Sequence, residues 1–335
     1  IHYDHHEVMS AWQIRQLHEA MKTVLSQVLS CPEKPVSACK AAQEHAHAGE
    51  RTAPDSGDGA GGGYRDLGDR FWSVAMEKGY ETAVYQDGNM LSFRELYMAA
   101  ADLAFRIKVL AEGKVWPITM EKSAELIVAM MAALLAEVPW VMIPPNLPEK
   151  RKEMMLEKAG CVRTAGRNLA YIVFTSGSTG VPKGVAITRD NLDNLIRGME
   201  RIYADGPILS VAGTGVDAFI LDSVAALLNG HAIIIPGEGT AEDPKALGTL
   251  IEKYDEENLF VTPSRLMAYM KDDAFARAAG HLKTVLCGGE MFPYALFEKL
   301  RDCGVARIYN QYGPSETTVA VSVKALTEGG TMTTG

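Results

Sequence analysis

The stretch from Leu169 to Val185, which reads LAYIVFTSGSTGVPKGV, is the segment that decides the fold. Its first part, Leu169 to Phe174, is short, apolar and rich in β-forming residues, which predicts a buried strand. A loop of glycine and hydroxyl residues follows that strand, and Lys183 closes the loop. Glycine permits backbone angles at which successive N–H groups turn toward one anion. The pattern therefore predicts a loop that holds phosphate.

The residues that would contact phosphate share small size, a hydroxyl group or a positive charge. They are Thr175, Ser176, Gly177, Ser178, Thr179, Gly180 and Lys183. The spacing excludes a Walker loop, because Pro182 and Gly184 stand where that pattern needs glycine and Ser or Thr. An ordinary polar turn between two strands is the alternative, since such turns are also rich in glycine and hydroxyl residues. Ten consecutive positions that suit phosphate favour the binding loop.

Residues 175–184, TSGSTGVPKG, resemble the phosphate loop of the adenylate-forming superfamily. This superfamily contains nonribosomal peptide synthetase adenylation domains, acyl- and aryl-CoA ligases and luciferases. The resemblance covers about residues 64–335 and implies a layered αβαβα large subdomain with two mixed sheets packed with helices and a small barrel-like part. Alternating helix and strand patterns from Tyr64 onward independently predict an α/β fold.

The resemblance also implies what lies beyond this sequence. It stops at Gly335, before the family's ribose-binding aspartate and its small C-terminal subdomain, whose lysine contacts the adenylate. We therefore expect an adenylation domain without its C-terminal subdomain, in a chain that is a fragment, a degenerate copy or a misassembled gene product. Residues 145–169 and 201–216 also look shorter than the corresponding parts of the family.

The residues before position 64 predict a separate region. Residues 8–29 carry apolar side chains at helical spacing, and residues 44–63 have too few apolar groups to repay the entropy of ordering. Residues 1–30 resemble the last helix of a fungal-type condensation domain, residues 31–63 are expected to be a flexible linker, and residues 64–335 are the adenylation domain. His5 and His6 lack the Asp-Gly of the condensation motif, so we interpret them as surface residues.

Composition excludes several functional classes. A net charge of −9 argues against a nucleic-acid partner, because such binding needs a basic face. The apolar run from Leu126 to Ala136 is too short to span a bilayer and predicts a buried helix, so no membrane partner is expected. Five cysteines without a C-x-x-C pair favour reduced thiols and a cytoplasmic location.

Local signals place several elements after Tyr64. Residues 82–85 predict a strand, Asp87-Gly88 a turn, and Ser92 with Glu95 a capping box. One apolar face of the following helix is predicted to comprise Leu96, Ala99, Ala100, Leu103, Ala104 and Ile107. Asp190 is predicted to cap a later helix, whose inward residues would be Leu192, Leu195, Ile196, Met199 and Ile202.

Residues 309–318, YNQYGPSETT, resemble the family's adenine and magnesium motif. Tyr312 can stack on adenine, and Asn310 can recognise its exocyclic amine. Nucleotide contacts are implied for Asn310, Gln311, Tyr312, Ser315 and Glu316, as well as for Gly289 and Glu290 in the segment LCGGE at 286–290. The resemblance makes Glu316 the Mg²⁺ ligand and gives catalytic roles to Glu316, Lys183 and Thr179. Plain Gly-Pro and Gly-Gly turns are the alternatives.

Residues 215–219, GVDAF, resemble the substrate-recognition motif of peptide synthetases. There an aspartate at the position of Asp217 pairs with the α-ammonium group of an amino acid, whereas a CoA ligase for simple carboxylic acids has no ammonium group to pair. A solvated loop aspartate is the alternative. Carrying the family's pocket over gives Asp217, Ala218, Leu221, Phe260, Leu286, Gly288, Gln311, Val319 and Ala320. This mainly apolar set predicts a medium-sized hydrophobic amino acid.

The leading hypothesis is ATP-dependent activation of an amino acid as its aminoacyl-adenylate, with ATP and Mg²⁺ bound. The resemblance implies transfer to the phosphopantetheine of a peptidyl carrier domain, with a condensation domain of the same or a neighbouring polypeptide as a further partner in secondary metabolite synthesis. Two alternatives remain open: an acyl- or aryl-CoA ligase, and an inactive truncated remnant that acts only as a binding module.

Overall fold

The computed structural model describes residues 66–162, 164, 168–176 and 181–328. All of them lie in one compact unit of the chain, residues 64–335. The predictions for residues 1–30 and 31–63, and those for Gly177, Ser178, Thr179 and Gly180, lie outside the described residues. Within the described ranges, no helix is both long and apolar enough to cross a membrane.

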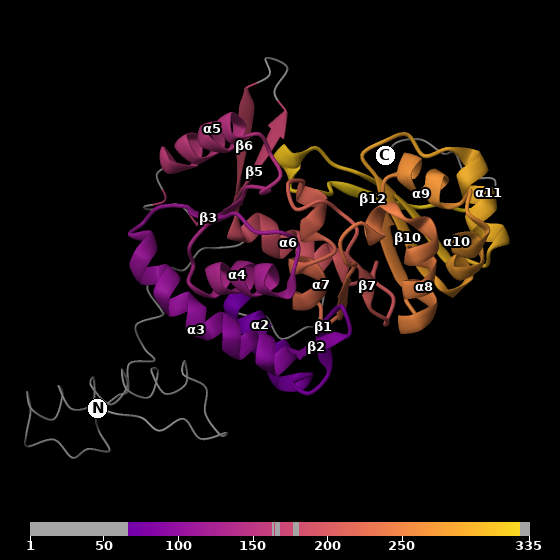
Figure 1. The fold of residues 1–335 in the computed structure, drawn as a ribbon, viewed down its shortest axis with the longest axis horizontal. Helices are drawn as coiled ribbons and strands as arrows, with labels where there is room; N and C mark the ends of the chain where they lie inside the picture. The colour runs from indigo at the N-terminus through magenta and orange to yellow at the C-terminus, as the bar shows by residue number, and fades with distance from the viewer. Residues whose placement is uncertain (1–65, 163, 165–167, 177–180, 329–335) are drawn as a thin grey trace, which may run out of the picture. The chain divides into compact units, whose positions relative to one another are not determined.

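Two mixed β-sheets organise the described residues (Figure 1). The larger sheet has the order β12-β11-β10-β9-β7-β8-β1-β2, with six parallel strands between antiparallel pairs at its two ends. Its strands are β1 (Thr82–Gln86), β2 (Asn89–Ser92), β7 (Ile208–Leu209), β8 (Ile233–Ile235), β9 (Asn258–Val261), β10 (Thr284–Gly288), β11 (Arg307–Tyr312) and β12 (Ser322–Ala325). The smaller sheet has the order β3-β4-β5-β6, formed by β3 (Trp116–Ile118), β4 (Trp140–Met142), β5 (Leu169–Ser176) and β6 (Pro182–Thr188).

Helices form layers between and outside the two sheets. The central layer comprises α2 (Leu67–Glu77), α3 (Phe93–Ala111), α4 (Ala124–Leu135), α6 (Arg189–Met199) and α7 (Val224–Leu228). The larger sheet's outer face is covered by α8 (Pro244–Tyr254), α9 (Pro263–Tyr269), α10 (Asp273–Ala278) and α11 (Tyr294–Asp302), and the smaller sheet's outer face by α5 (Glu149–Gly160). This is the predicted αβαβα order.

Alternation along the strands explains why both faces of each sheet are covered. In β8, Ile233 and Ile235 belong to the central core, whereas Ile234 packs into the outer core with α8–α11. In β5, Tyr171 faces the central core and Ile172 faces α5. Successive strand side chains point to opposite faces, so an unbroken apolar strand needs a layer on each side.

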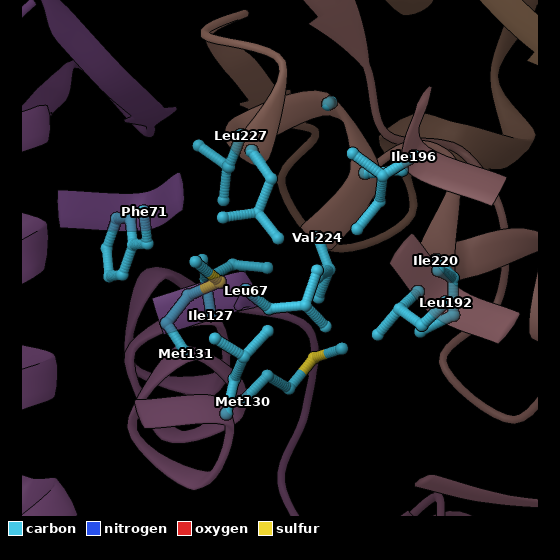
Figure 2. Packing of buried hydrophobic residues seen from close by; sticks show 14 of the residues in the cluster. Leu67, Phe71, Ile127, Met130, Met131, Leu192, Ile196, Ile220, Val224 and Leu227 are labelled. Carbon is cyan, nitrogen blue, oxygen red and sulfur yellow. The ribbon is translucent and has the colours of Figure 1, made fainter. Parts of the chain in front are cut away.

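The central core is built around α4. Leu126, Ile127 and Met130 in this helix are almost fully buried, and they pack against side chains of α2, α6 and α7 (Figure 2). The apolar run of residues 126–136 is therefore a buried helix, as its composition predicts. The start of α3 is also as predicted, because the side chains and backbones of Ser92 and Glu95 form both halves of a capping box.

Two local predictions need correction. Ala99 is exposed and does not lie on the buried face of α3, while Tyr97, which the periodicity did not select, is buried. Helix α6 is capped by Thr188 and not by Asp190, because the Thr188 hydroxyl accepts the Asn191 N–H at 3.2 Å. Asp190 lies in the first turn instead. An acidic side chain is favourable at either place, so composition alone cannot separate them.

A buried carboxyl group completes the short strand β7. Glu256 is fully buried, and its Oε1 accepts the N–H groups of Leu209 at 2.8 Å and Asn258 at 3.1 Å. Its Oε2 has no hydrogen-bond partner among the described residues. Burial raises the pKa of Glu256 well above its ordinary value. The carboxyl group therefore links β7 to β9 through these two hydrogen bonds. Its raised pKa means that the folded protein favours the protonated, neutral form.

The helix cap gives a first prediction. Thr188→Ala should lower the free energy of unfolding by about 1 kcal/mol, since one N-terminal N–H of α6 loses its acceptor. Asp190→Ala, which leaves the cap in place, should change it by less than about 0.5 kcal/mol. Urea unfolding of both variants measures the difference. A larger loss for Asp190→Ala would contradict the assignment of the cap.

The pH dependence of stability gives a second prediction. A carboxyl group whose pKa is raised in the folded protein stabilises fully below its unfolded pKa, and this contribution is lost as the pH rises through the folded pKa. The Tm of the natural protein should therefore fall between about pH 5 and about pH 9 by more than that of Glu256→Gln, which stays neutral. Glu252→Gln, an exposed change on α8, is the matched control and should follow the natural protein. Parallel Tm curves for Glu256→Gln and the natural protein would refute the assignment.

Candidate functional site

The two strands on either side of the predicted phosphate loop form a β-hairpin. Strands β5 and β6 pair antiparallel, with Thr175 opposite Lys183 and Ser176 opposite Pro182. The four loop residues between Ser176 and Val181 lie outside the described residues. A loop between two strands is the position that both interpretations of this segment expect, so contacts from the rest of the chain must distinguish them.

One such contact is an ion pair between the hairpin and a distant turn. Lys183 Nζ in β6 lies 3.1 Å from Glu316 Oε1 in η6 (Ser315–Thr317), although the two residues are 133 positions apart. Both side chains are well exposed. A hydrogen bond from the residue's own backbone N–H, together with the Lys183 ammonium, holds the pKa of the Glu316 carboxyl below its usual value. The fold thus brings together the charged residues of two separate motifs.

The donor set around Glu316 does not form a metal site by itself. In the part of the chain that the structure describes, no group of three or more His, Cys, Asp or Glu side chains could hold a metal ion. Mg²⁺ commonly binds one or two protein carboxylates and completes its shell with phosphate oxygens and water. Glu316 fits a cation that is shared with a phosphate ligand.

Three predicted site residues follow one another in strand β11 and alternate between the two faces of the larger sheet. Asn310 is buried and its Oδ1 has no hydrogen-bond partner among the described residues, whereas the Tyr312 ring is half exposed at the end of the strand. An unpartnered buried oxygen can accept an amine hydrogen, and an exposed ring can stack on a base. Gln311 lies between them and points to the other face of the sheet.

The amide of Gln311 is used within the protein. Its Nε2 donates to the carbonyl of Val319 at 2.9 Å. Gly288 lies opposite Gln311 in the sheet, and a Cβ atom there would come within 3.2 Å of the Gln311 Cβ. The fold therefore brings the predicted residues Gly288, Gln311 and Val319 together, with the amide nitrogen engaged by backbone.

The turn after β11 is conformationally strained. Thr318 and Val319 both have φ values in the left-handed region, +67° and +65°. This region is unfavourable for β-branched residues and costs on the order of 1–3 kcal/mol for each. Gly313 lies directly against this turn, because a Cβ atom there would be 2.4 Å from the carbonyl oxygen of Val319. Such strain often marks functional sites.

The segment after β10 is held by a neighbouring helix. The Glu290 carboxylate accepts hydrogen bonds from the Ser264 backbone N–H at 3.0 Å and from the Ser264 hydroxyl at 2.8 Å. These two bonds join the segment to the start of α9. Gly289 adopts a φ of +81°, which glycine permits without strain. Glu290 thus has a structural role in this state, and Gly289 shapes the turn beside the candidate nucleotide residues.

The predicted substrate aspartate begins the short helix η3 (Asp217–Ile220). The Oδ2 atom of Asp217 is buried without a hydrogen-bond partner among the described residues, and the Tyr171 hydroxyl is in the same state. Burial raises the pKa of the Tyr171 hydroxyl, and the negative charge of Asp217 raises it further. The two groups therefore interact electrostatically. A buried carboxylate oxygen without a donor is suited to an ammonium group.

The apolar pocket residues lie within the central core. Leu221, Phe260, Leu286 and Val319 are buried in one cluster, with Ala320 packed against it, and Ala218 is partly buried. Tyr203, which the sequence did not single out, donates its hydroxyl to the carbonyl of Leu221 at 2.8 Å and packs its ring against Phe260 at 5.3 Å. Its only signal was a place near the end of an apolar helix pattern.

A cavity of about 710 Å³ lies elsewhere, between the β1–β2 hairpin and helices α3 and α4. Its lining includes Met90, Leu103, Val128 and Glu125, and none of the predicted site residues. The candidate site is therefore defined by converging motif residues and not by this cavity.

Comparison with known proteins identifies relatives of this chain. The model of a family described as "AMP-binding enzyme" matches residues 71–165 and 161–335. Gramicidin S synthase 2 of Brevibacillus brevis is 28% identical over 286 residues, which is 72% of this chain and 6% of that protein. Surfactin synthase subunit 3 of Bacillus subtilis is 30% identical over 281 residues, covering 71% of this chain and 22% of that protein. The chain thus spans a small part of these relatives.

Solved structures share the fold. The N-terminal subdomain of Klebsiella oxytoca NpsA, in complex with 3-hydroxyanthranilyl-AMSN, matches 78% of this chain and 75% of that chain with a TM-score of 0.69 and 22% identity. The AMPPNP-bound form of the nonribosomal peptide synthetase FmoA3 matches 95% of this chain and 39% of that chain with a TM-score of 0.71 and 19% identity.

The strained turn gives a third prediction. Gly313→Ala should lower the free energy of unfolding by about 1–3 kcal/mol, because the added methyl group meets the backbone of Val319 and Ala320. Gly198→Ala in α6, where no atom lies within 4 Å of the new methyl group, should be neutral or stabilising. Equal unfolding free energies for Gly313→Ala and Gly198→Ala would contradict the close approach.

Proposed function

The chain belongs to the AMP-binding enzyme family, and from this premise we propose that residues 64–335 form the large subdomain of a peptide-synthetase adenylation domain. Its reaction would be ATP-dependent activation of an amino acid as the aminoacyl-adenylate. The observation that carries the proposal is the 3.1 Å contact between Lys183 and Glu316, because it joins the phosphate-loop hairpin to the turn after β11. A simple polar turn would need no such partner.

ATP would lie between the hairpin and the end of β11. Asn310 would accept the adenine amine through its unpartnered Oδ1, and the half-exposed Tyr312 ring would stack on the base. The phosphates would meet Lys183 and the hairpin donors, which are Thr175, Ser176, Gly177, Ser178, Thr179 and Gly180. Gly289, Glu290, Gln311 and Ser315 would shape the surroundings of the nucleotide.

Glu316 would hold Mg²⁺ jointly with the phosphate oxygens. Its low pKa keeps the carboxylate charged, and the absence of a protein-only metal cluster among the described residues suits a cation that arrives with the nucleotide. When bound, the cation supplies positive charge that stabilises the phosphate oxygens of the transition state. The Lys183 ammonium, 3.1 Å from this carboxylate, would lie beside the same phosphate oxygens.

The amino acid would bind through Asp217. Its buried, unpartnered Oδ2 would accept the α-ammonium group, and Ala218, Leu221, Phe260, Leu286, Gly288, Val319 and Ala320 would surround an apolar side chain. The substrate carboxylate would then attack the α-phosphorus in line while pyrophosphate leaves. Lys183 and the hairpin N–H groups would stabilise the charge that develops on the phosphate oxygens.

The product would pass to a carrier domain. A thioester on the phosphopantetheine of a peptidyl carrier domain is the expected acceptor, with a condensation domain as the further partner. The solved PA1221 structure, a synthetase protein containing adenylation and carrier (PCP) domains, matches 79% of this chain and supports this arrangement. The free thiols among the described cysteines suit a reducing compartment, so we place the reaction in the cytoplasm.

Exchange of pyrophosphate into ATP, measured with leucine, valine or phenylalanine and with the matching acids that lack the amino group, tests this function. Amino acids should stimulate exchange, and Asp217→Asn should lower kcat/KM for the amino acid by about 10- to 100-fold with little change in the KM for ATP. Asp205→Asn, an exposed change, is the matched control.

Two other outcomes would replace the proposal. Exchange driven by the simple acids and unaffected by Asp217→Asn would indicate an acyl- or aryl-CoA ligase. Calorimetry that shows no binding of ATP to the folded chain would indicate a remnant that serves only as a binding module.

A further inference from the structure

The segment from Ala212 to Asp222, which carries Asp217, is closed at its base by a buried side chain. The N–H of Ala212 donates to Asp222 Oδ2 at 2.9 Å, across ten positions of the chain. Asp222 is fully buried, and its Oδ1 has no hydrogen-bond partner in the described ranges. The carboxylate therefore fixes the two ends of a loop whose middle presents the candidate substrate aspartate.

A lysine from another part of the chain binds the carbonyl side of the Ala212 backbone. Lys122 lies just before α4, and its Nζ donates to the carbonyl of Ser210 at 2.8 Å, to the Ser210 hydroxyl at 3.4 Å and to the carbonyl of Ala212. The same ammonium lies 5.1 Å from the ring centroid of Phe219, inside η3. Ala212 is thus held at its carbonyl by Lys122 and at its N–H by Asp222.

Two further contacts hold the backbone on either side of Ala212, at Val211 and at Gly215. Arg265 donates to the carbonyl of Val211 at 3.1 Å, and Gly215 lies close against Pro144, where a Cβ atom would meet the proline ring at 2.7 Å. Asp217 follows directly after this close approach. The position of its carboxylate therefore depends on how the base of the segment is held.

The electrostatic environment makes this arrangement costly. Burial raises the pKa of Asp222 to about 6, against the opposing charge of Lys122, and burial lowers the pKa of Lys122. The titratable groups that face Asp222 are Lys122 and Tyr203, and those that face Lys122 are Asp222, Arg265 and Glu242. Burial of charged groups costs desolvation free energy, which their mutual attraction offsets only in part. An energetic penalty retained at this place needs a reason other than stability.

We propose that Lys122 and Asp222 are positioning residues that hold the 212–222 segment so that Asp217 can receive the ammonium group of an amino acid substrate. This inference rests on the proposed role of Asp217. It extends that role to two residues that do not touch the substrate, and it makes substrate recognition dependent on the charge of Asp222.

Stability and recognition should respond oppositely to pH. Because the pKa of Asp222 is raised in the folded protein, its contribution to stability is full below the unfolded pKa and falls as the pH rises through about 6. The hydrogen bond from the Ala212 N–H to Asp222 is strongest above that pH, since an ionised carboxylate is a better acceptor than a protonated one. Asp222→Asn should therefore be no less stable near neutral pH, yet bind the amino acid more weakly.

Calorimetry with two nonhydrolysable probes tests this idea. One probe is leucyl-sulfamoyladenosine, and the other is the 4-methylpentanoyl analogue, which lacks the amino group. At about pH 7.5, Asp222→Asn and Lys122→Met should weaken binding of the first probe by about tenfold and of the second by less than about twofold. The natural protein should lose part of this preference at about pH 5.5, whereas Asp222→Asn should not. Glu252→Gln, an exposed change on α8 away from Lys122, Arg265 and Asp222, is the matched control.

Hydrogen exchange without ligand gives an independent result. Peptides covering residues 210–217 should exchange faster in Asp222→Asn than in the natural protein or in Glu252→Gln. Unchanged exchange, or equal weakening of both probes together with a lower Tm, would overturn the proposal. A natural protein that binds neither probe would contradict the proposed function instead, and the exchange result would then decide the positioning role alone.

Discussion

Helix α4 has almost no face toward solvent, and this constraint organises the rest of the described structure. Residues such as Leu126, Met130 and Met131 are almost fully buried, so apolar layers must cover the helix from several sides. The larger sheet, the smaller sheet and helices α2, α6 and α7 supply these layers. Since burying a large apolar side chain contributes about 1.5–3 kcal/mol, this layer stabilises the association of the two sheets. Their relative position in turn allows residues of both sheets to meet at one site.

The site depends on that meeting. Lys183 belongs to the smaller sheet and Glu316 follows the last parallel strand of the larger one, so their contact exists only when both sheets pack on the central helices. The 212–222 segment follows the two-residue strand β7, which Glu256 completes through side-chain hydrogen bonds. Buried polar groups thus fix the segments where the apolar core ends. Such groups specify geometry even where they add little to stability.

The sequence predicted features that depend on neighbouring residues. The capping box of Ser92 and Glu95 and the buried helix α4 have the predicted form, because their signals lie within a few positions of the chain. The αβαβα order was implied by the resemblance and agrees with the structure. The roles assigned to the site residues remain predictions. Ala99 and the cap of α6 were assigned wrongly, since tertiary packing and a choice between adjacent polar residues decided them. Lys122 gave no local signal, and Tyr203 gave only its place near the end of an apolar helix pattern, because the partners of both residues are distant in sequence.

The central claim is that the β5–β6 hairpin and the turn after β11 form one binding site for Mg²⁺ and ATP. A double-mutant cycle on the full chain, with Lys183→Met and Glu316→Gln, tests this claim through the Kd for Mg²⁺ and ATP measured by calorimetry. The account predicts that each change weakens binding and that the double variant departs from the sum of the two by at least about 0.5 kcal/mol. Binding that is unchanged in both single variants, with the fold intact, would contradict it.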